Sequence, residues 1–463
     1  MIPAQELVEH GLDAAAAGGA DACIVLVDEA SHADVRFALN RTTTNGVHRA
    51  RSVSVIAIAG SSIGSARRSG AVGLEVVTEM VADALTDARE APAAEDAFAL
   101  VDPGAAPSAA RAFGLEPELT SAGVLDGVLS ALSGMFGRAV ARDTVVAGFA
   151  EQDVTTTYLG TSAGVRLSHA QPTGAVHLVG RTAGGSASAW VGAPTIAPAL
   201  GEMEDELWRR LDWGGRQVAL DAGRYEVIMP PSGVADLMAM LSFYALGGQD
   251  TEDGRTVFSK DGGGTRVGER LSELPFTLYS DPFAASVECA PFVMTRASSS
   301  ESSVFDNGLA LGRIDWVREG VLHHLRYHRA GAAKSGVDAA PDVDNLMLDC
   351  GRSDGGTVDD MVARTERGLL LTCLWYIREV DPATLLVTGL TRDGVYVVED
   401  GAVVGAANNF RFNESPVDLL ARATEVGTPL RTLGREFGEY LNRAVMPPLR
   451  IPDFNMSTVS QAS

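Results

Sequence analysis

The sequence predicts an α+β protein in which N-terminal α/β domains are followed by a mostly antiparallel, β-rich C-terminal domain. Helical and strand-like periodicities alternate up to residue 223. From Arg224 onward, many short strand candidates follow one another with Gly, Asp and Asn at the joins. The 463 residues exceed one ordinary hydrophobic core, because domains typically span about 100–200 residues. We therefore predict three domains, at residues 1–110, 111–223 and 224–463.

The first predicted domain, residues 1–110, is a small α/β unit. Residues 5–18 and Leu74–Arg89 have helical periodicity. Three strand-like runs lie between them, at Cys23–Asp28, Val35–Leu39 and Ser52–Ala59. The following stretch, Glu90–Ser108, is rich in Ala, Pro and Asp with little periodicity, which is typical of a linker or surface excursion. The first domain boundary is therefore expected there.

The middle predicted domain, residues 111–223, repeats the mixture of helices and strands. A helix is predicted around Ala122–Ala141 and another near Ala197–Leu211. Between them the sequence predicts three alternating strands, Thr155–Leu159, Val165–His169 and Ala175–Val179. This domain is a second α/β unit.

The C-terminal predicted domain, residues 224–463, is dominated by short strands. Two helices are expected in it, about Val234–Tyr244 and Pro416–Glu425. The strand candidates are Tyr225–Met229, Phe276–Tyr279, Arg313–Val317, Val321–Tyr327, Leu346–Asp349, Leu369–Cys373, Leu385–Thr388 and Val395–Val398. Near the end, Leu449 and Ile451 flank Arg450, a pattern that predicts the inward face of a short terminal strand.

Charge and cysteine content exclude several classes of function. The formal net charge of -23 repels nucleic acid and anionic lipid, so no direct nucleic-acid or membrane partner is expected. The four cysteines are widely scattered without a CxxC, which argues against a zinc ribbon or a disulfide framework. No stretch reaches the roughly 18–20 uninterrupted apolar residues of a membrane helix. The acidic, amphipathic start does not resemble a secretory signal, so a cytoplasmic location is expected.

One pentapeptide, Gly160-Thr161-Ser162-Ala163-Gly164, matches the GxSxG nucleophile elbow of α/β-hydrolases. A serine hydrolase using Ser162, a downstream Asp and one of His323, His324 or His328 is therefore one alternative. An elbow requires a helix after the serine, whereas the residues after Gly164 alternate like a strand. A hairpin turn, with Gly160 and Gly164 at positive φ, fits the pattern better.

Metal and nucleotide sites lack their usual motifs. His323, His324 and His328 form the densest histidine cluster, but on a strand His323 points away from the other two and the segment contains no carboxylate. No HExxH helix and no GxxxxGK[ST] loop occurs, and the glycines of DGGGTRVG do not form a GxGxxG. We therefore predict no catalytic, cofactor-binding or metal-binding residue in this chain.

Eight segments of the predicted C-terminal domain form an ordered set: Tyr225–Pro231, Arg266–Leu271, Thr277–Pro282, Trp316–Leu322, Leu386–Gly389, Val397–Gly401, Pro448–Ile451 and Met456–Ser460. Together, and in this order, they resemble the TldD/PmbA family, once called modulators of DNA gyrase. A fainter resemblance reaches Tyr158–Gly164, where family members have a strand, a turn and a strand.

The family contains two kinds of chain, and the resemblance implies which kind this one is. TldD-like chains carry HExxxH on a helix early in the third domain and a cysteine near the C-terminus, and together these bind zinc. Here the corresponding helix, Val234–Tyr244, contains neither histidine nor glutamate, and Thr432–Gly438 contains no cysteine. The chain resembles the PmbA/TldE-like half, which lacks zinc.

The resemblance implies a non-catalytic partner subunit of a two-chain zinc peptidase that cleaves unfolded peptides. Zinc is expected in the TldD-like partner and no cofactor in this chain. Unfolded peptides are expected to pair with a strand edge in a cleft, with little dependence on sequence. A scaffold or binding protein without a role in proteolysis is a further alternative, and a homodimer of the isolated chain stays open.

Overall fold

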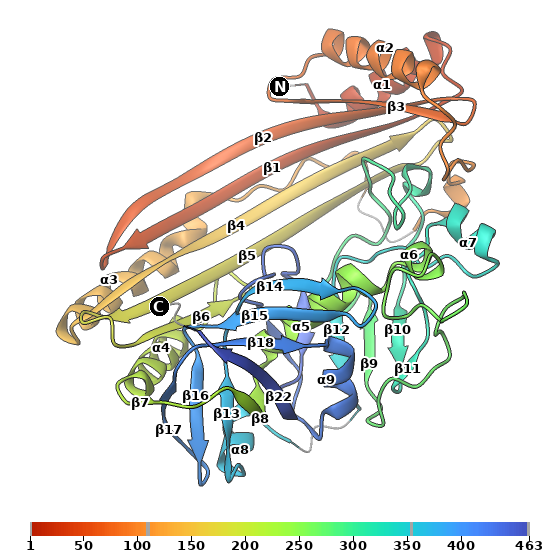
Figure 1. Ribbon diagram of the computed structural model, residues 1–463. Coiled ribbons are helices and arrows are strands. Elements are labelled where there is room, and N and C mark those ends of the chain that lie inside the picture. Colours follow the sequence, from red (N-terminus) through yellow and green to blue (C-terminus); the bar gives the residue numbers. More distant parts are fainter. Residues whose placement is uncertain (1, 108–111, 352–354, 461–463) are drawn as a thin grey trace.

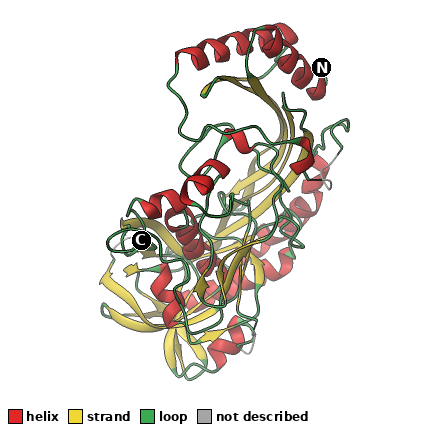
Figure 2. Ribbon diagram, turned by 90° about the vertical axis from the view of Figure 1, so that its right-hand side faces the viewer, coloured by secondary structure: helices red, strands yellow, loops and turns green. Residues whose placement is uncertain are grey.

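The computed structural model describes residues 2–107, 112–351 and 355–460. A long N-terminal sheet runs across the top of the molecule and a β-rich body lies beneath it, as Figure 1 shows. Helices cover the outer face of the long sheet, and the view turned by 90° shows the strands curving away from the lower body (Figure 2). This arrangement confirms the predicted α+β class.

The N-terminal sheet has the strand order β3-β2-β1-β4-β5-β6, and every neighbouring pair is antiparallel. Two long hairpins form its centre. Its strands are β1 Ala22–Ala38, β2 Arg41–Ala59, β3 Ser62–Ser69, β4 Thr144–Thr161, β5 Arg166–Thr182 and β6 Ser188–Ala193. Since β1 pairs with β4, the first two predicted units contribute strands to one continuous sheet.

The strands of this sheet are longer than the sequence pattern predicted. Cys23–Asp28 and Val35–Leu39, predicted as separate strands, both fall largely within β1, and Val165–His169 and Ala175–Val179 fall largely within β5. Polar residues interrupt the apolar alternation, but other elements satisfy them. The Thr157 hydroxyl donates to Asp28 Oδ1 at 2.7 Å, and the backbone N–H of Thr120 donates to Ser31 Oγ at 3.0 Å.

Four helices cover the two ends of the sheet. The helices α1 (Ala4–Ala17) and α2 (Leu74–Glu90) pack on one end, and α3 (Asp126–Ala141) and α4 (Leu200–Gly214) pack on the other, each pair over its own apolar cluster. By length and composition alone, Ala122–Ala141 could cross a membrane. In the structure, one face of this segment is buried in the cluster over the sheet.

The C-terminal body contains two further sheets. One has the order β14-β15-β18-β22-β8-β13-β16-β17-β7, with β19 paired to β22, and the other has the order β11-β10-β9-β12-β21-β20. The strands of the first are β7 Gln217–Val218, β8 Gly223–Met229, β13 Arg367–Leu371, β14 Leu374–Asp381, β15 Leu386–Thr391, β16 Val395–Glu399, β17 Ala402–Ala407, β18 Phe410–Glu414, β19 Glu425–Val426 and β22 Leu449–Val459. Those of the second are β9 Thr277–Ser280, β10 Ile314–Arg318, β11 Val321–Leu322, β12 Leu346–Asp349, β20 Leu430–Thr432 and β21 Ala444–Met446.

Helix α5 (Pro231–Ala245) lies in the core of this body. It is apolar around most of its circumference, which is typical of a helix buried on all sides, and proline occupies its first turn. Short helices complete the body: α6 Gly248–Glu252, α7 Arg329–Ser335, α8 Val358–Ala363 and α9 Pro416–Arg422. Single 3-10 turns occur at Pro103–Ala105, Ala122–Leu125 and Val304–Asp306.

Two expectations for this body need correction. The strand predicted over Val321–Tyr327 ends at Leu322, because the chain then turns away to cap α7 through His328. The helix predicted over Pro416–Glu425 ends at Arg422, and Glu425–Val426 instead pairs with β22 as β19.

Polar contacts fix the N-terminal sheet to the C-terminal body. Arg296 pairs with Asp28 on β1 at 2.5 Å. Asn442 Nδ2 donates to the Gly174 carbonyl at 3.1 Å, and Arg431 donates to the Pro194 carbonyl at 2.8 Å. These contacts come from different segments of the body and hold one face of the sheet beside it.

The terminal strand β22 shows the predicted inward face, but it is longer and more central than predicted. Leu449 and Ile451 are buried, and Arg450 pairs with Glu226 and Glu425. The strand runs between β18 and β8 and so is paired on both sides. The C-terminal segment is therefore an inner strand of the largest sheet.

Ile451→Ala is expected to lower the free energy of unfolding by about 2–5 kcal/mol, because it opens a cavity beneath an inner strand. The matched control is Val459→Ala on the same strand, whose side chain is 48% exposed and should cost less than about 1 kcal/mol. Denaturant unfolding followed by circular dichroism measures both. Equal losses in the two variants would contradict the placement of β22.

Candidate functional site

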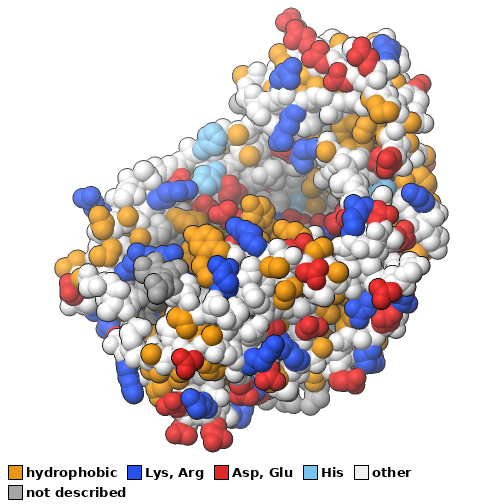
Figure 3. Space-filling model, in the orientation of Figure 1, with side chains coloured by type: hydrophobic (Ala, Val, Ile, Leu, Met, Phe, Trp, Pro, Cys, Tyr) orange, Lys and Arg blue, Asp and Glu red, His pale blue; other side chains and the backbone are white. Residues whose placement is uncertain are grey.

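A cleft lies between the long sheet and the C-terminal body. Figure 3 shows it as a hollow near the middle of the molecule, with apolar side chains along its lower rim. Two adjoining cavities, of about 540 Å³ and 340 Å³, occupy the cleft and share His177, Gly438 and Glu439. The cleft is therefore lined by parts of the chain that are far apart in sequence.

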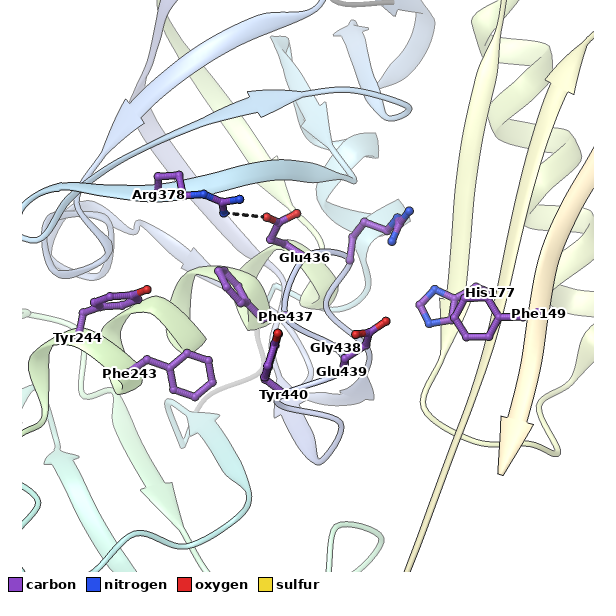
Figure 4. A pocket seen from close by; sticks show the side chains of 11 residues that line it. Phe149, His177, Phe243, Tyr244, Arg378, Glu436, Phe437, Gly438, Glu439 and Tyr440 are labelled. Atoms are coloured by element: carbon purple, nitrogen blue, oxygen red, sulfur yellow. Dashed lines mark hydrogen bonds and ion pairs between the residues drawn. The ribbon is translucent and has the colours of Figure 1, made fainter. Parts of the chain in front are cut away.

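Five elements line the larger cavity (Figure 4). The end of α5 provides Phe243 and Tyr244, and strand β14 provides Arg378. The loop between β20 and β21 provides residues 435–440, and the long sheet provides Phe149 and His177 from β4 and β5. The Phe243 and Phe437 rings meet edge to face, with centroids 6.1 Å apart.

The Asp236 carboxylate joins α5 to this loop. It accepts backbone N–H groups from three consecutive residues, Arg435 at 2.9 Å, Glu436 at 3.1 Å and Phe437 at 2.9 Å. The side chain is 1% exposed. A Cβ atom at Gly434 would lie 2.3 Å from Asp236 Oδ1, so the close approach of the loop requires glycine there. The loop is thus fastened to the helix through one buried carboxylate.

Two features of the surroundings of Asp236, its burial and its hydrogen bonds, shift its pKa in opposite directions. Burial raises the pKa of this carboxyl to about 7, while the three N–H donors oppose the rise because they favour the ionised form. Both oxygens are occupied by these donors. The carboxylate therefore has a structural role in this arrangement.

Arg435 lies between two tryptophan rings. Its guanidinium carbon is 3.9 Å from the centroid of Trp375 on β14 and 5.5 Å from that of Trp190 on β6. Cation–π attraction at such distances favours a fixed orientation of the planar group. The arginine side chain therefore bridges the C-terminal body and the long sheet at the cleft.

His177 is the histidine of the cleft. Its ring stacks on Phe149 with centroids 4.4 Å apart, and its Nδ1 accepts the Trp190 indole N–H at 3.2 Å. Burial, and then the positive charge of Arg435, lowers the pKa of His177 to about 4. The imidazole is therefore neutral at physiological pH.

The smaller cavity is acidic. Glu151 and Asp153 on β4 line it together with Glu439 from the loop. Burial and then the neighbouring Asp153 raise the pKa of Glu151. The cleft consequently has a cationic, aromatic part around Arg435 and an acidic part around Glu151.

The two segments that the resemblance would equip with zinc ligands do meet in the structure, through Asp236 and the loop. Their side chains do not fit a catalytic zinc, which needs about three protein ligands around an open position. Both oxygens of Asp236 accept backbone N–H groups, and Glu436 pairs with Arg378 at 3.3 Å. Across residues 2–107, 112–351 and 355–460, no three His, Cys, Asp or Glu side chains gather as a metal-binding group.

Ser162 lies in a hairpin turn. Strand β5 follows it in place of the helix that an elbow requires, which confirms the predicted strand and removes the geometric basis for a nucleophile. Ser162 Oγ accepts the Cys23 N–H at 3.0 Å. Gly164 has the predicted positive φ of 101°, but the prediction for Gly160 was wrong: a Cβ there would lie 2.3 Å from Val8 Cγ1, so close packing requires that glycine.

The histidines of the predicted cluster separate because the strand ends at Leu322. His323 and His324 contact each other through their Nδ1 atoms at 2.7 Å, and Arg318 donates to His323 Nε2 at 2.9 Å. His328 accepts the Gly331 N–H at the start of α7. His328 thus caps a helix and does not join the other two.

Sequence reasoning missed the residues that shape the cleft. A carboxylate inside the otherwise apolar helix Val234–Tyr244 was a signal for Asp236, because a buried charge requires partners. No comparable signal marks Arg435, Trp375 and Trp190, because they come from three separate elements.

Comparison with known proteins places the C-terminal body in a family. Residues 222–458 match the family model described as the PmbA/TldA metallopeptidase C-terminal domain. No curated protein matches the sequence.

Solved structures share the fold over nearly the whole chain. The crystal structure of TldE from Thermococcus kodakarensis has a TM-score of 0.75 at 16% identity and covers 97% of this chain and 99% of that chain. A protein from Bacteroides thetaiotaomicron designated a modulator of DNA gyrase has a TM-score of 0.76 at 15% identity, covering 98% and 99%. One from Thermotoga maritima with the same designation has a TM-score of 0.75 at 14% identity, covering 97% and 99%.

Asp236→Ala is expected to lower the free energy of unfolding by at least about 3 kcal/mol, because three backbone donors lose their acceptor. Asp13→Ala, at an exposed position of α1, is the control and should change it by less than about 0.5 kcal/mol. Denaturant titration measures the two variants. A cost for Asp236→Ala as small as that of the control would contradict the proposed anchor.

His177 should make stability depend on pH. Since its pKa in the folded protein lies below the value of 6.5 expected on unfolding, its contribution is full above pH 6.5 and is lost as the pH falls towards 4. The loss can reach roughly 3 kcal/mol. The raised pKa of Asp236 acts in the opposite direction, but it is common to wild type and variant.

Thermal unfolding of the wild type and of His177→Gln, measured at several pH values between 7.5 and 4, isolates this contribution. Wild type should lose more stability than the variant as the pH falls. Parallel curves for the two proteins would show that His177 does not titrate as its burial implies.

Proposed function

Because this chain belongs to the PmbA/TldD metallopeptidase family, we propose that it is the non-catalytic subunit of a two-chain, TldD/TldE-type zinc peptidase that cleaves unfolded peptides in the cytoplasm. In this proposal the zinc belongs to a TldD-like partner. The present chain supplies a wall of the peptide-binding cleft and supports the partner's site.

The observation that carries the proposal is the junction of α5 and the loop that contains residues 435–437. In zinc-bearing members, the corresponding helix carries HExxxH and a nearby C-terminal segment carries a cysteine. Here the helix presents Asp236 to the loop, and three backbone N–H groups occupy that carboxylate. The same two segments are kept together by hydrogen bonds, so their contact needs no metal.

A strand edge beside the cleft supports the peptide-binding part of the proposal. Strand β14 ends the largest sheet, and its Arg378 lines the larger cavity. An edge strand exposes backbone N–H and C=O groups that can pair with an extended peptide whatever its side chains. Such pairing would suit an unfolded substrate.

Exposed apolar residues near the cleft support a partner surface. Tyr376 and Val380 on β14 are 51% and 56% exposed, and Tyr440 in the loop is 72% exposed. Large apolar side chains left in solvent at a cleft rim favour a protein partner. We expect the partner interface to exceed about 1,000 Å², as a stable specific contact requires.

The isolated chain is expected to contain no stoichiometric zinc and to cleave nothing, because the two family segments lack a zinc ligand set. Mixed with a TldD-like HExxxH chain from the same organism, it should form an active peptidase that a metal chelator inactivates. Metal analysis and cleavage of an unfolded protein substrate, with each chain alone and with both, measure these outcomes.

The matched control is a partner whose HExxxH glutamate is replaced by glutamine, which should still assemble but should not cleave. One zinc per isolated chain, or metal-dependent cleavage by this chain alone, would contradict the proposal. Assembly without any peptidase activity would instead assign the chain to a scaffold role.

A further inference from the structure

Arg435 is a cation in the cleft without a carboxylate partner. Among the described residues, no acidic side chain forms an ion pair with its guanidinium, and its buried Nε has no hydrogen-bond partner. The adjacent Glu436 is engaged by Arg378 at 3.3 Å instead. A guanidinium that is partly buried in this way leaves hydrogen-bonding capacity unused.

The tryptophan rings contact Arg435 in a way that restricts where a ligand could approach. The ring centroid of Trp375, in the C-terminal body, lies 3.9 Å from the guanidinium carbon of Arg435. The ring centroid of Trp190, on the long sheet, lies 5.5 Å from the same carbon. Rings stack over the faces of the planar group, so the N–H groups along its edge stay available. Arg435 also lines the larger cavity, so its side chain borders space that a ligand can occupy.

The positive charge of Arg435 changes the pKa of a neighbouring side chain. It is the second cause, after burial, of the low pKa of His177. The imidazole is consequently neutral and does not compete with Arg435 for an anion. The cation is also not cancelled by Glu439, whose carboxylate forms no ion pair within the described part of the chain.

The cavity wall around Arg435 is aromatic. Phe149, Phe243, Phe437 and Tyr440 line the same space, which offers apolar contact close to the positive charge of Arg435. A ligand that fits both features carries a planar anion next to an apolar group. A carboxylate matches the guanidinium fork with two parallel hydrogen bonds.

We propose that Arg435 binds a carboxylate of a peptide in the cleft, with an adjacent apolar side chain of that peptide against the aromatic wall. This inference rests on the proposed function, in which peptides occupy the cleft. The carboxylate belongs either to the C-terminus of the peptide or to an acidic side chain, and both have the same chemistry.

The adjoining acidic cavity determines the direction in which the bound peptide runs. Glu151 and Asp153 line the part of the cleft that continues beyond His177. They repel a second anion and attract an ammonium or guanidinium group. A peptide whose carboxylate is on Arg435 should therefore extend its amino-terminal or basic part towards Glu151.

Isothermal titration of the isolated full chain with three probes tests the proposal. The probes are N-acetyl-Ala-Phe with a free carboxylate, the same peptide as its C-terminal amide, and N-acetyl-Glu-Phe as its amide. At least one of the two carboxylate probes should bind about tenfold more tightly than the neutral amide, as a charge-assisted pair implies. Which one does so identifies the source of the carboxylate.

Arg435→Gln should abolish this preference, and Arg435→Lys should keep part of it, because a lysine retains the charge without the fork. Arg367→Gln, at an exposed arginine of β13 that lines neither cavity, is the matched control and should bind like wild type. Thermal unfolding of each variant checks that it is folded. If Arg435→Gln does not fold, a reduced preference in Arg435→Lys carries the test.

Equal affinity of wild type for all three probes, or no binding of any of them, would overturn the proposal. So would a carboxylate preference that persists in Arg435→Gln. Because the titration uses neither the zinc-bearing partner nor peptidase activity, its result is distinguishable from a failure of the proposed function. Binding on Arg435 without an active two-chain enzyme would leave this inference standing.

Discussion

The arrangement of the cleft depends on one buried carboxylate. Asp236 lies on a helix that is otherwise suited to a fully apolar core, and burying a lone charge there would be costly without partners. Three consecutive N–H groups provide those partners and fix the loop from Arg435 to Phe437 against the helix. The direction in which Arg435 and Phe437 point follows from that attachment. The cleft wall is therefore a consequence of how this charge is accommodated.

The long N-terminal sheet completes the cleft by contributing the opposite wall. Trp190 on β6 and His177 on β5 lie on the side of the sheet that meets the body, and the Trp190 indole N–H donates to His177. The guanidinium of Arg435, which belongs to the body, contacts the Trp190 ring. Polar contacts such as Asn442 to the Gly174 carbonyl hold this edge of the sheet in place. As a result, the electrostatics of the cleft arise from both parts: the cation comes from the body, and much of the acidic side comes from β4.

The sequence predicted the fold class and most helices, because amphipathic periodicity is local. The pattern predicted two short strands in place of each of β1 and β5. In β1, polar residues such as Asp28 and Ser31 interrupt the apolar alternation, and their hydrogen-bond partners lie far away in the chain. The sequence also indicated the helix and loop that meet at the cleft, through a family resemblance. The Arg435, Trp375 and Trp190 group could not be predicted, because long-range topology alone brings these three residues together.

In the function proposed above, this chain is the metal-free half of a two-chain zinc peptidase. Native mass spectrometry of the chain co-expressed with a TldD-like HExxxH chain tests it most directly, because the mass reports both composition and bound metal. We expect a complex that contains both chains, with zinc present in the free partner and missing from this chain when each is measured separately. Two separate homo-oligomers with no mixed complex, or zinc bound to this chain alone, would contradict it.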